Sequence, residues 1–199
     1  CAFADMGLGL GGDTLKSTAE DLLFNRALPL NSYKTSRFTL DKDSPNALVM
    51  QTSIGQGNTL VSPMHMALIT SAIANDGVLM KPTMIDKIVN NSGDMVRETE
   101  KTEYKRLMTR NEANILGKLM KNVVENGTAS ALNGRGYTVA GKTGSAEFDE
   151  NGSSHSWFVG YSNVDDPDIA IAVIVENGGT GSEAAVPIAA DVFDAYYFD

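Results

Sequence analysis

The sequence predicts an α+β fold in which helices pack against an antiparallel sheet. Helical patterns fill much of the first two thirds of the 199 residues, three short strand-like segments follow one another between residues 137 and 176, and a last helical pattern closes the chain. Consecutive strands joined by short turns pair antiparallel, and flanking helices can bury their apolar stripes on the resulting sheet.

Two helices are predicted in the first eighty residues. The first runs from an N-cap at Asp13 or Thr14 to about Asn25, with apolar side chains along one side at Leu15, Ala19, Leu22 and Leu23. Residues 26–50 look irregular because they contain prolines and many polar residues. The second helix has Ser62 as its cap and Pro63 in its first turn, and it ends just before Gly77.

The middle of the chain predicts a hairpin and a longer helix. Met84 to Val96 forms the hairpin around residues 90–93, and the mixed charges from Arg97 to Lys105 indicate a solvated surface. Thr109 and Glu112 form a capping box for a helix that ends at Asn126 and is closed by Gly127. Its core side is predicted to carry Leu116, Leu119, Met120 and Val123.

Three strands and one helix complete the chain. The strands are predicted at Tyr137–Gly141, Ser156–Tyr161 and Ile169–Glu176, with the first two side by side. The last helix spans roughly Ala184 to Tyr197, and its proline fits only in the first turn. This order places Lys142 at the end of a strand and near the end of the sheet.

Charge and composition exclude several classes of function. A net charge of −9 argues against nucleic acid and against unaided docking on anionic lipid. Cys1 is the only cysteine, so no internal disulfide or cysteine metal cluster can form, and no cofactor or metal is predicted. The longest apolar run, Ile169 to Val175, is too short to span a bilayer. The chain begins with cysteine and shows no signal peptide, so we expect it to be a piece of a longer product.

The segment Val139 to Glu147 has two interpretations. It contains Lys142-Thr143-Gly144, the K-T-G element of penicillin-reactive serine acyl-transferases, and with Gly136 it also satisfies the P-loop pattern G-x-x-x-x-G-K-[ST]. A P-loop lysine stands at the start of a helix. Here strand-forming residues precede Lys142, and glycine, asparagine and serine without helical period follow it. The sequence therefore favours K-T-G over a phosphate-binding loop.

Four segments in order resemble the penicillin-binding proteins, specifically the transpeptidase domain of the monofunctional, membrane-anchored class (class B type). They are Ser53 to Ala67, Ala72 to Gly77, Val139 to Glu147, and His155 to Tyr161. The resemblance covers nearly all of residues 1–199 and implies a β-lactamase/transpeptidase-like fold. It implies that residues 1–199 are the C-terminal portion of a single penicillin-binding transpeptidase domain, incomplete by itself.

Two motifs of that family are missing. The chain contains no S-x-x-K, and its one formal S-x-N, Ser44-Pro45-Asn46, lies in a charged loop and is typical of a turn. In the family, S-x-N comes directly before a segment like the one that begins at Cys1. The resemblance therefore implies that the nucleophilic serine lies upstream, in a missing half of the domain that would be the partner of this one.

The resemblance also assigns roles to the K-T-G segment. Lys142 would be the cation near the terminal carboxylate of a D-alanyl-D-alanine stem peptide or a β-lactam, and the Thr143 and Ser145 hydroxyls would bind that carboxylate. The backbone N–H of Ser145 would be one oxyanion donor, and Gly144 would keep the strand bare where the ligand lies. Lys142 and Ser145 are thus the candidate catalytic residues, and residues 142–145 form the candidate substrate site.

The implied function is a D,D-transpeptidase that cross-links peptidoglycan through an acyl-serine enzyme and is acylated by β-lactams. It would act at the extracytoplasmic face of the bacterial cell membrane, with an N-terminal anchor outside these residues. The alternatives are a β-lactamase or D,D-carboxypeptidase of the same fold, or a non-catalytic β-lactam sensor or scaffold. Both histidines have plainer interpretations, His65 in helix packing or at the surface and His155 at an exposed strand end. Trp157 is predicted to lie in the core.

Overall fold

A computed structural model describes residues 2–30, 33–148 and 154–198, which leaves Cys1 outside the described part. The helices are α1 Ala2–Leu10, α2 Gly12–Asp21, α3 Asn46–Ser53, α4 Pro63–Ala74, α5 Arg110–Asn126 and α6 Val186–Phe198, with a 3-10 turn at Ser130–Leu132 and a π-helical turn at Gly181–Ala185. The strands are β1 Val78–Met80, β2 Lys87–Val89, β3 Met95–Glu98, β4 Glu103–Arg106, β5 Val139–Glu147, β6 Ser154–Ser162 and β7 Ala170–Val175. The α+β prediction is confirmed. Within the described ranges, no helix is both long and apolar enough to cross a membrane.

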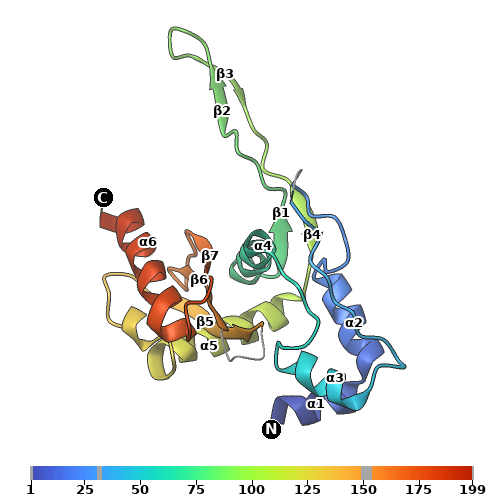
Figure 1. The fold of residues 1–199 in the computed structure, drawn as a ribbon. Helices are drawn as coiled ribbons and strands as arrows, with labels where there is room; N and C mark the ends of the chain where they lie inside the picture. Colours follow the sequence, from blue (N-terminus) through green and yellow to red (C-terminus); the bar gives the residue numbers. More distant parts are fainter. Residues whose placement is uncertain (1, 31–32, 149–153, 199) are drawn as a thin grey trace.

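The sheet that organises the fold is the antiparallel order β5-β6-β7, as predicted (Figure 1). Its two faces are covered by different helices. On one face Phe158 of β6 packs with Phe193 of α6, and neither side chain is exposed to solvent. On the other face Met66 of α4 lies beside Val159 and Trp157 of β6. The sheet is therefore sandwiched, and β5 forms one of its edges.

The helix caps that the sequence predicts for α4 and α5 are both present. Ser62 accepts a hydrogen bond from the backbone N–H of His65, and Pro63 is the first helical residue. At α5, Thr109 accepts from the backbone N–H of Glu112, and the Glu112 carboxylate accepts from the backbone N–H of Thr109 at 2.7 Å. The Thr109 hydroxyl also donates to the Glu112 carboxylate at 2.7 Å, and this bond, followed by the one from the Thr109 backbone N–H, lowers the pKa of the Glu112 carboxyl.

The predicted limits of the first helix are wrong at both ends. Its N-cap is Gly11, which offers no side-chain hydrogen bond, rather than Asp13 or Thr14. The helix ends at Asp21 because Leu23 and Asn25 adopt φ of 73° and 59°, a left-handed backbone that cannot continue a right-handed helix. The turn that results places Leu23 in the core among residues of α4.

Two further helices lie where the sequence analysis assigned none. Helix α1 was not predicted, and α3 begins at Asn46, inside the segment expected to be irregular. The N-cap of α3 is Pro45, which provides no side-chain hydrogen bond, so the usual start signal is missing. Because α1 and α3 pack against one another, tertiary contact supplies the helix stability that the local sequence signals do not indicate.

The predicted core side of helix α5 is right for Met120, which is buried, and for Val123, which packs half-buried against the core, but wrong for Leu119 and Leu116. Leu119 is 59% exposed and Leu116 is 38% exposed, whereas the other buried residues are the small or medium-sized Ala113, Gly117 and Val124. Small residues let the helix approach the sheet closely: a Cβ on Gly117 would lie 2.6 Å from the Tyr161 hydroxyl. The prediction missed this part of the core side because it ranked only the larger apolar side chains as core.

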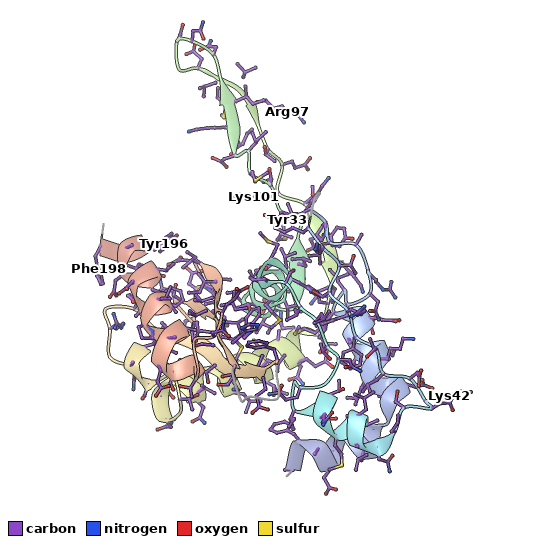
Figure 2. All side chains as sticks on the ribbon, viewed as in Figure 1. Tyr33, Lys42, Arg97, Lys101, Tyr196 and Phe198 are labelled. Carbon is purple, nitrogen blue, oxygen red and sulfur yellow. The ribbon has the colours of Figure 1, made fainter. Side chains whose placement is uncertain are left out.

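The hairpin of β2 and β3 is confirmed and forms an arm that projects away from the other elements (Figure 1). Every residue of both strands is exposed, and Figure 2 shows Arg97 and Lys101 reaching outward from this arm. The segment expected to be only a solvated surface also contributes β4, which pairs with β1 at the base of the arm.

A polar cluster ties α6 to the segment that leads into β5. The Tyr137 hydroxyl donates to Asp194 at 2.6 Å, and the Arg135 guanidinium bonds the same carboxylate. Burial, followed by the hydrogen bond to Asp194, raises the pKa of Tyr137 from 10.0 to about 12. The bonds from Tyr137 and Arg135 lower the pKa of Asp194. This cluster fixes the C-terminal helix over one face of the sheet.

Removing the Tyr137 hydroxyl is expected to destabilise the fold. Tyr137→Phe should lower the free energy of unfolding by about 1 kcal/mol at pH 7 in urea titrations. Since the folded pKa is raised, this tyrosine's contribution is complete below pH 10 and is lost as the pH rises to about 12. Tyr196→Phe, at a residue that is 53% exposed, is the matched control and should change little. Equal stability of both variants and the unmodified chain at pH 7 would contradict the role of the cluster.

Candidate functional site

Lys142 lies in the middle of β5 and not at the end of a strand, so that prediction is wrong. Its neighbours in the motif stay in register with β6, with Lys142 opposite Val159, Ser145 opposite Ser156 and Glu147 opposite Ser154. Continuous pairing with a partner strand outweighs the weak strand preference of the glycine and serine residues. The strand also shows that Lys142 does not open a helix, so the rejection of the P-loop is confirmed.

Alternation along β5 separates the motif into two sets of side chains. Lys142 and Gly144 face the same side as Val159 and Trp157, their partners on β6. Thr143 faces the opposite side, where it is buried near the π-helical turn at Gly181. By the same alternation Ser145, opposite Ser156, faces the Thr143 side. The cation and the two hydroxyls of the motif therefore point to different faces of the sheet, and all three lie along the same strand edge.

The outer edge of β5 is where the backbone of Thr143 and Ser145 can bind a ligand. The Gln56 amide donates to the Ser145 carbonyl at 3.1 Å, and Lys142 Nζ donates to the Thr143 carbonyl at 2.5 Å. In an antiparallel strand, the N–H and C=O of one residue point to the same edge. Both donors come from outside the β6 ladder, so the N–H groups of Thr143 and Ser145 also point away from β6.

A groove of about 250 Å³ runs along this edge and the Lys142 side of the strand. Its floor is formed by residues 142–146 of β5 together with Trp157 and Val159 of β6. Its opposite wall is formed by Ile54, Gly55 and Val61 from the loop between α3 and α4, and by Met66. Trp157 is thus partly buried and lines the groove, whereas the sequence placed it in the core.

The two hydroxyls of the motif differ in their surroundings. Thr143 is only 8% exposed, and its Oγ1 lies 2.6 Å from Oγ1 of Thr128, which follows α5. Ser145 is exposed beside the groove. A hydroxyl can donate one hydrogen bond and accept two, so Thr143 keeps some capacity, but Ser145 is the more accessible of the two.

Glycines allow the close packing beneath the motif. A Cβ on Gly141 would collide with the ring of Phe158, and one on Gly181 would lie 2.7 Å from the Trp157 carbonyl and 2.9 Å from the Gly144 carbonyl. A Cβ on Gly144 would approach the Trp157 Cβ at 3.3 Å and project into the groove. These positions keep the ladder compact and its floor open.

The other residues singled out from the sequence lie apart from this chemistry. Ser44 forms a turn, since its hydroxyl bonds Asp41, as the sequence predicts. His65 is fully buried, its Nε2 lies 2.7 Å from the Leu22 carbonyl, and burial lowers its pKa. His155 stacks on Phe148 with ring centroids 4.3 Å apart. Across residues 2–30, 33–148 and 154–198, no three histidine, cysteine or acidic side chains gather as a metal site.

Sequence reasoning missed two residues that contact the motif, Gln56 and Thr128. Thr128 lies outside any pattern and Gln56 is 89 positions from Ser145, so only the fold brings them to β5. Two signals were available for Gln56: it belongs to the segment Ser53 to Ala67 that resembles the family, and glycines flank it on both sides. In the structure Gly55 and Gly57 adopt φ of 83° and 79°, which favours glycine and marks a specifically shaped loop.

Comparison with known proteins identifies relatives of the whole chain. The family model "Penicillin binding protein transpeptidase domain" matches residues 1–194. Penicillin-binding protein 3 of Bacillus subtilis is 32% identical over 183 residues, which cover 88% of this chain and 26% of that protein. The peptidoglycan D,D-transpeptidase PbpA of Mycolicibacterium smegmatis is 29% identical over 198 residues, which cover 94% of this chain and 40% of that protein.

Solved structures agree with these relatives. The imipenem acyl-enzyme of penicillin-binding protein A from M. tuberculosis matches with a TM-score of 0.85 and 27% identity, over 98% of this chain and 44% of that one. The D,D-transpeptidase domain of a peptidoglycan glycosyltransferase from Eggerthella lenta matches with a TM-score of 0.84 and 28% identity, over 98% and 50%. The chain thus spans half or less of the length of these relatives.

Filling the space beneath the motif is expected to disrupt the sheet. Gly141→Ala should lower the free energy of unfolding by about 1–3 kcal/mol, because the new methyl group would meet the fully buried ring of Phe158. Gly9→Ala in α1, with no neighbouring atom within 4 Å, is the control and should not destabilise. Chemical denaturation of the two variants checks this, and equal stability would show that Phe158 can move aside.

Proposed function

We propose that residues 1–199 are the C-terminal portion of one serine-type D,D-transpeptidase domain. The premise is that this chain belongs to the family of penicillin-binding protein transpeptidase domains. The proposed reaction cross-links peptidoglycan stem peptides through an acyl-serine intermediate, and β-lactams acylate the same serine. The observation that carries the proposal is the outer edge of β5 at K-T-G, where β5 ends the three-stranded sheet and where backbone donors, a cation and an exposed hydroxyl lie beside one groove.

The nucleophile in this proposal lies outside residues 1–199. The chain contains no S-x-x-K, and it spans only 40% of the M. smegmatis transpeptidase that it resembles. We therefore assign the attacking serine, its lysine base and the S-x-N motif to a segment N-terminal to Cys1. Residues 1–199 would supply the substrate anchor and half of the oxyanion hole to that segment.

The proposed roles on β5 follow from the direction of each group. The Ser145 N–H, which points away from β6, would donate to the oxyanion that forms when serine attacks the D-alanine carbonyl. The Lys142 ammonium would attract the terminal carboxylate, and the Ser145 hydroxyl would bind it. The Thr143 hydroxyl, which already bonds Thr128, would make the weaker contribution. Gly144 would leave room for the ligand between Lys142 and Ala146.

The relatives support persistent acylation over rapid turnover. Solved structures of M. tuberculosis penicillin-binding protein A include acyl-enzymes with imipenem, ceftriaxone and penicillin G. An acyl-enzyme that survives crystallisation is typical of a penicillin target and not of an efficient β-lactamase.

By analogy, the complete protein would act on peptidoglycan at the extracytoplasmic face of the membrane, held there by an anchor outside residues 1–199.

Intact mass after incubation with benzylpenicillin tests the proposed function. The complete protein that contains residues 1–199 should gain the mass of one benzylpenicillin molecule and keep it for many minutes. Residues 1–199 alone should gain nothing, because they lack the proposed nucleophile. A complete protein that stays unmodified would favour a non-catalytic scaffold, and rapid appearance of hydrolysed penicillin would favour a β-lactamase.

Lys142→Ala in the complete protein tests the role of the cation. We expect the second-order rate constant for acylation by benzylpenicillin to fall about 10- to 100-fold, the effect of losing one charge-assisted hydrogen bond. Lys118→Ala, which removes an exposed lysine from α5, is the control and should leave the rate unchanged. An unchanged rate in Lys142→Ala would remove Lys142 from the site.

A further inference from the structure

The side-chain amide of Gln56 is hydrogen-bonded to a backbone carbonyl that a bound peptide would need as an acceptor. Its Nε2 donates to the Ser145 carbonyl at 3.1 Å, although the two residues are 89 positions apart in the chain. Gln56 belongs to the loop between α3 and α4, whose neighbouring residues Ile54 and Gly55 form the wall of the groove opposite β5. This hydrogen bond therefore joins the two walls of the groove.

The backbone of the loop holds Gln56 in this position. The N–H of Gln56 donates to the Gln51 carbonyl at 3.0 Å, which closes a turn at the end of α3. Gly55 and Gly57 on either side adopt left-handed φ of 83° and 79°, and Gln56 itself is half-buried. Hence the backbone of the loop places the Gln56 side chain within reach of the Ser145 carbonyl.

An extended peptide that lies along an open strand edge bonds the carbonyls and N–H groups that point outward. On β5 those carbonyls belong to Thr143 and Ser145, and each already accepts a side-chain donor, Lys142 Nζ and Gln56 Nε2. Lys142 is flexible and charged, so it can turn to a carboxylate. Gln56 instead mimics the amide N–H of a peptide and competes with it for Ser145.

We propose that Gln56 is a specificity-determining residue, whose amide must be displaced from the Ser145 carbonyl by a backbone N–H of the acyl donor. The inference rests on the proposed transpeptidase function. A ligand that carries an amide N–H at this place exchanges one hydrogen bond for another, so it gains little net free energy there. A ligand without that N–H leaves Gln56 where it is. Gln56 thus limits the free energy that acyl donors with a peptide-like N–H gain over ligands that lack one.

Two β-lactams separate these cases in the complete protein. Benzylpenicillin carries an acylamino N–H next to its reactive ring, and imipenem carries a hydroxyethyl group there. Gln56→Met keeps the length of the side chain but removes its donor and frees the Ser145 carbonyl. We expect the acylation rate constant to rise about three- to ten-fold for benzylpenicillin and to change less than two-fold for imipenem.

Controls distinguish a failed inference from a failed function. Asn58→Ala removes an exposed amide from the same loop and should change neither rate. Gln56→Ala should repeat the selective increase if Gln56→Met does not fold. Equal changes for both ligands, or no change, would overturn the inference while acylation of the unmodified protein upheld the function. Absence of acylation in the unmodified protein would overturn both.

Discussion

The uninterrupted antiparallel pairing of β5 with β6 is the constraint on which the site depends. All nine residues of β5 have partners on β6, so the backbone direction of each motif residue is fixed by the ladder. The pairing is possible because Gly141 and Gly160 leave room for the Phe158 ring and Gly181 lets the π-helical turn rest on the backbone. Dense packing beneath the strand therefore determines which groups reach its free edge.

Fixed backbone direction separates the two interpretations of the Gly-Lys-Thr pattern. In a P-loop, a lysine and successive N–H groups at a helix start surround a phosphate. In β5, the N–H groups of Thr143 and Ser145 point to one edge of the sheet, and successive side chains point to its two faces in turn. This arrangement suits an extended ligand with a carboxylate at one end, such as the stem peptide of the proposed function.

The groove combines elements that are distant in the chain. The loop after α3 and the first turns of α4 form one wall, and β5 with β6 forms the other. Helix α4 contacts β6 and β7 and begins with a well-formed cap at Ser62, so it connects this loop to the sheet. Gln56 closes the gap between these walls. The geometry of the groove is thus a property of α4 and the sheet together.

The sequence by itself determined the fold class, the strand order from residue 137 onward, the caps of α4 and α5, and the segment that carries the candidate chemistry. These depend on local patterns: strand alternation, capping boxes, and a motif whose residues are adjacent. Only the tertiary structure decided that Lys142 lies in mid-strand, that Ala113 and Gly117 form the core side of α5, and that Gln56 and Thr128 contact the motif. Each of these depends on contacts between distant residues, and such contacts outweigh local preference when they bury surface or complete a ladder.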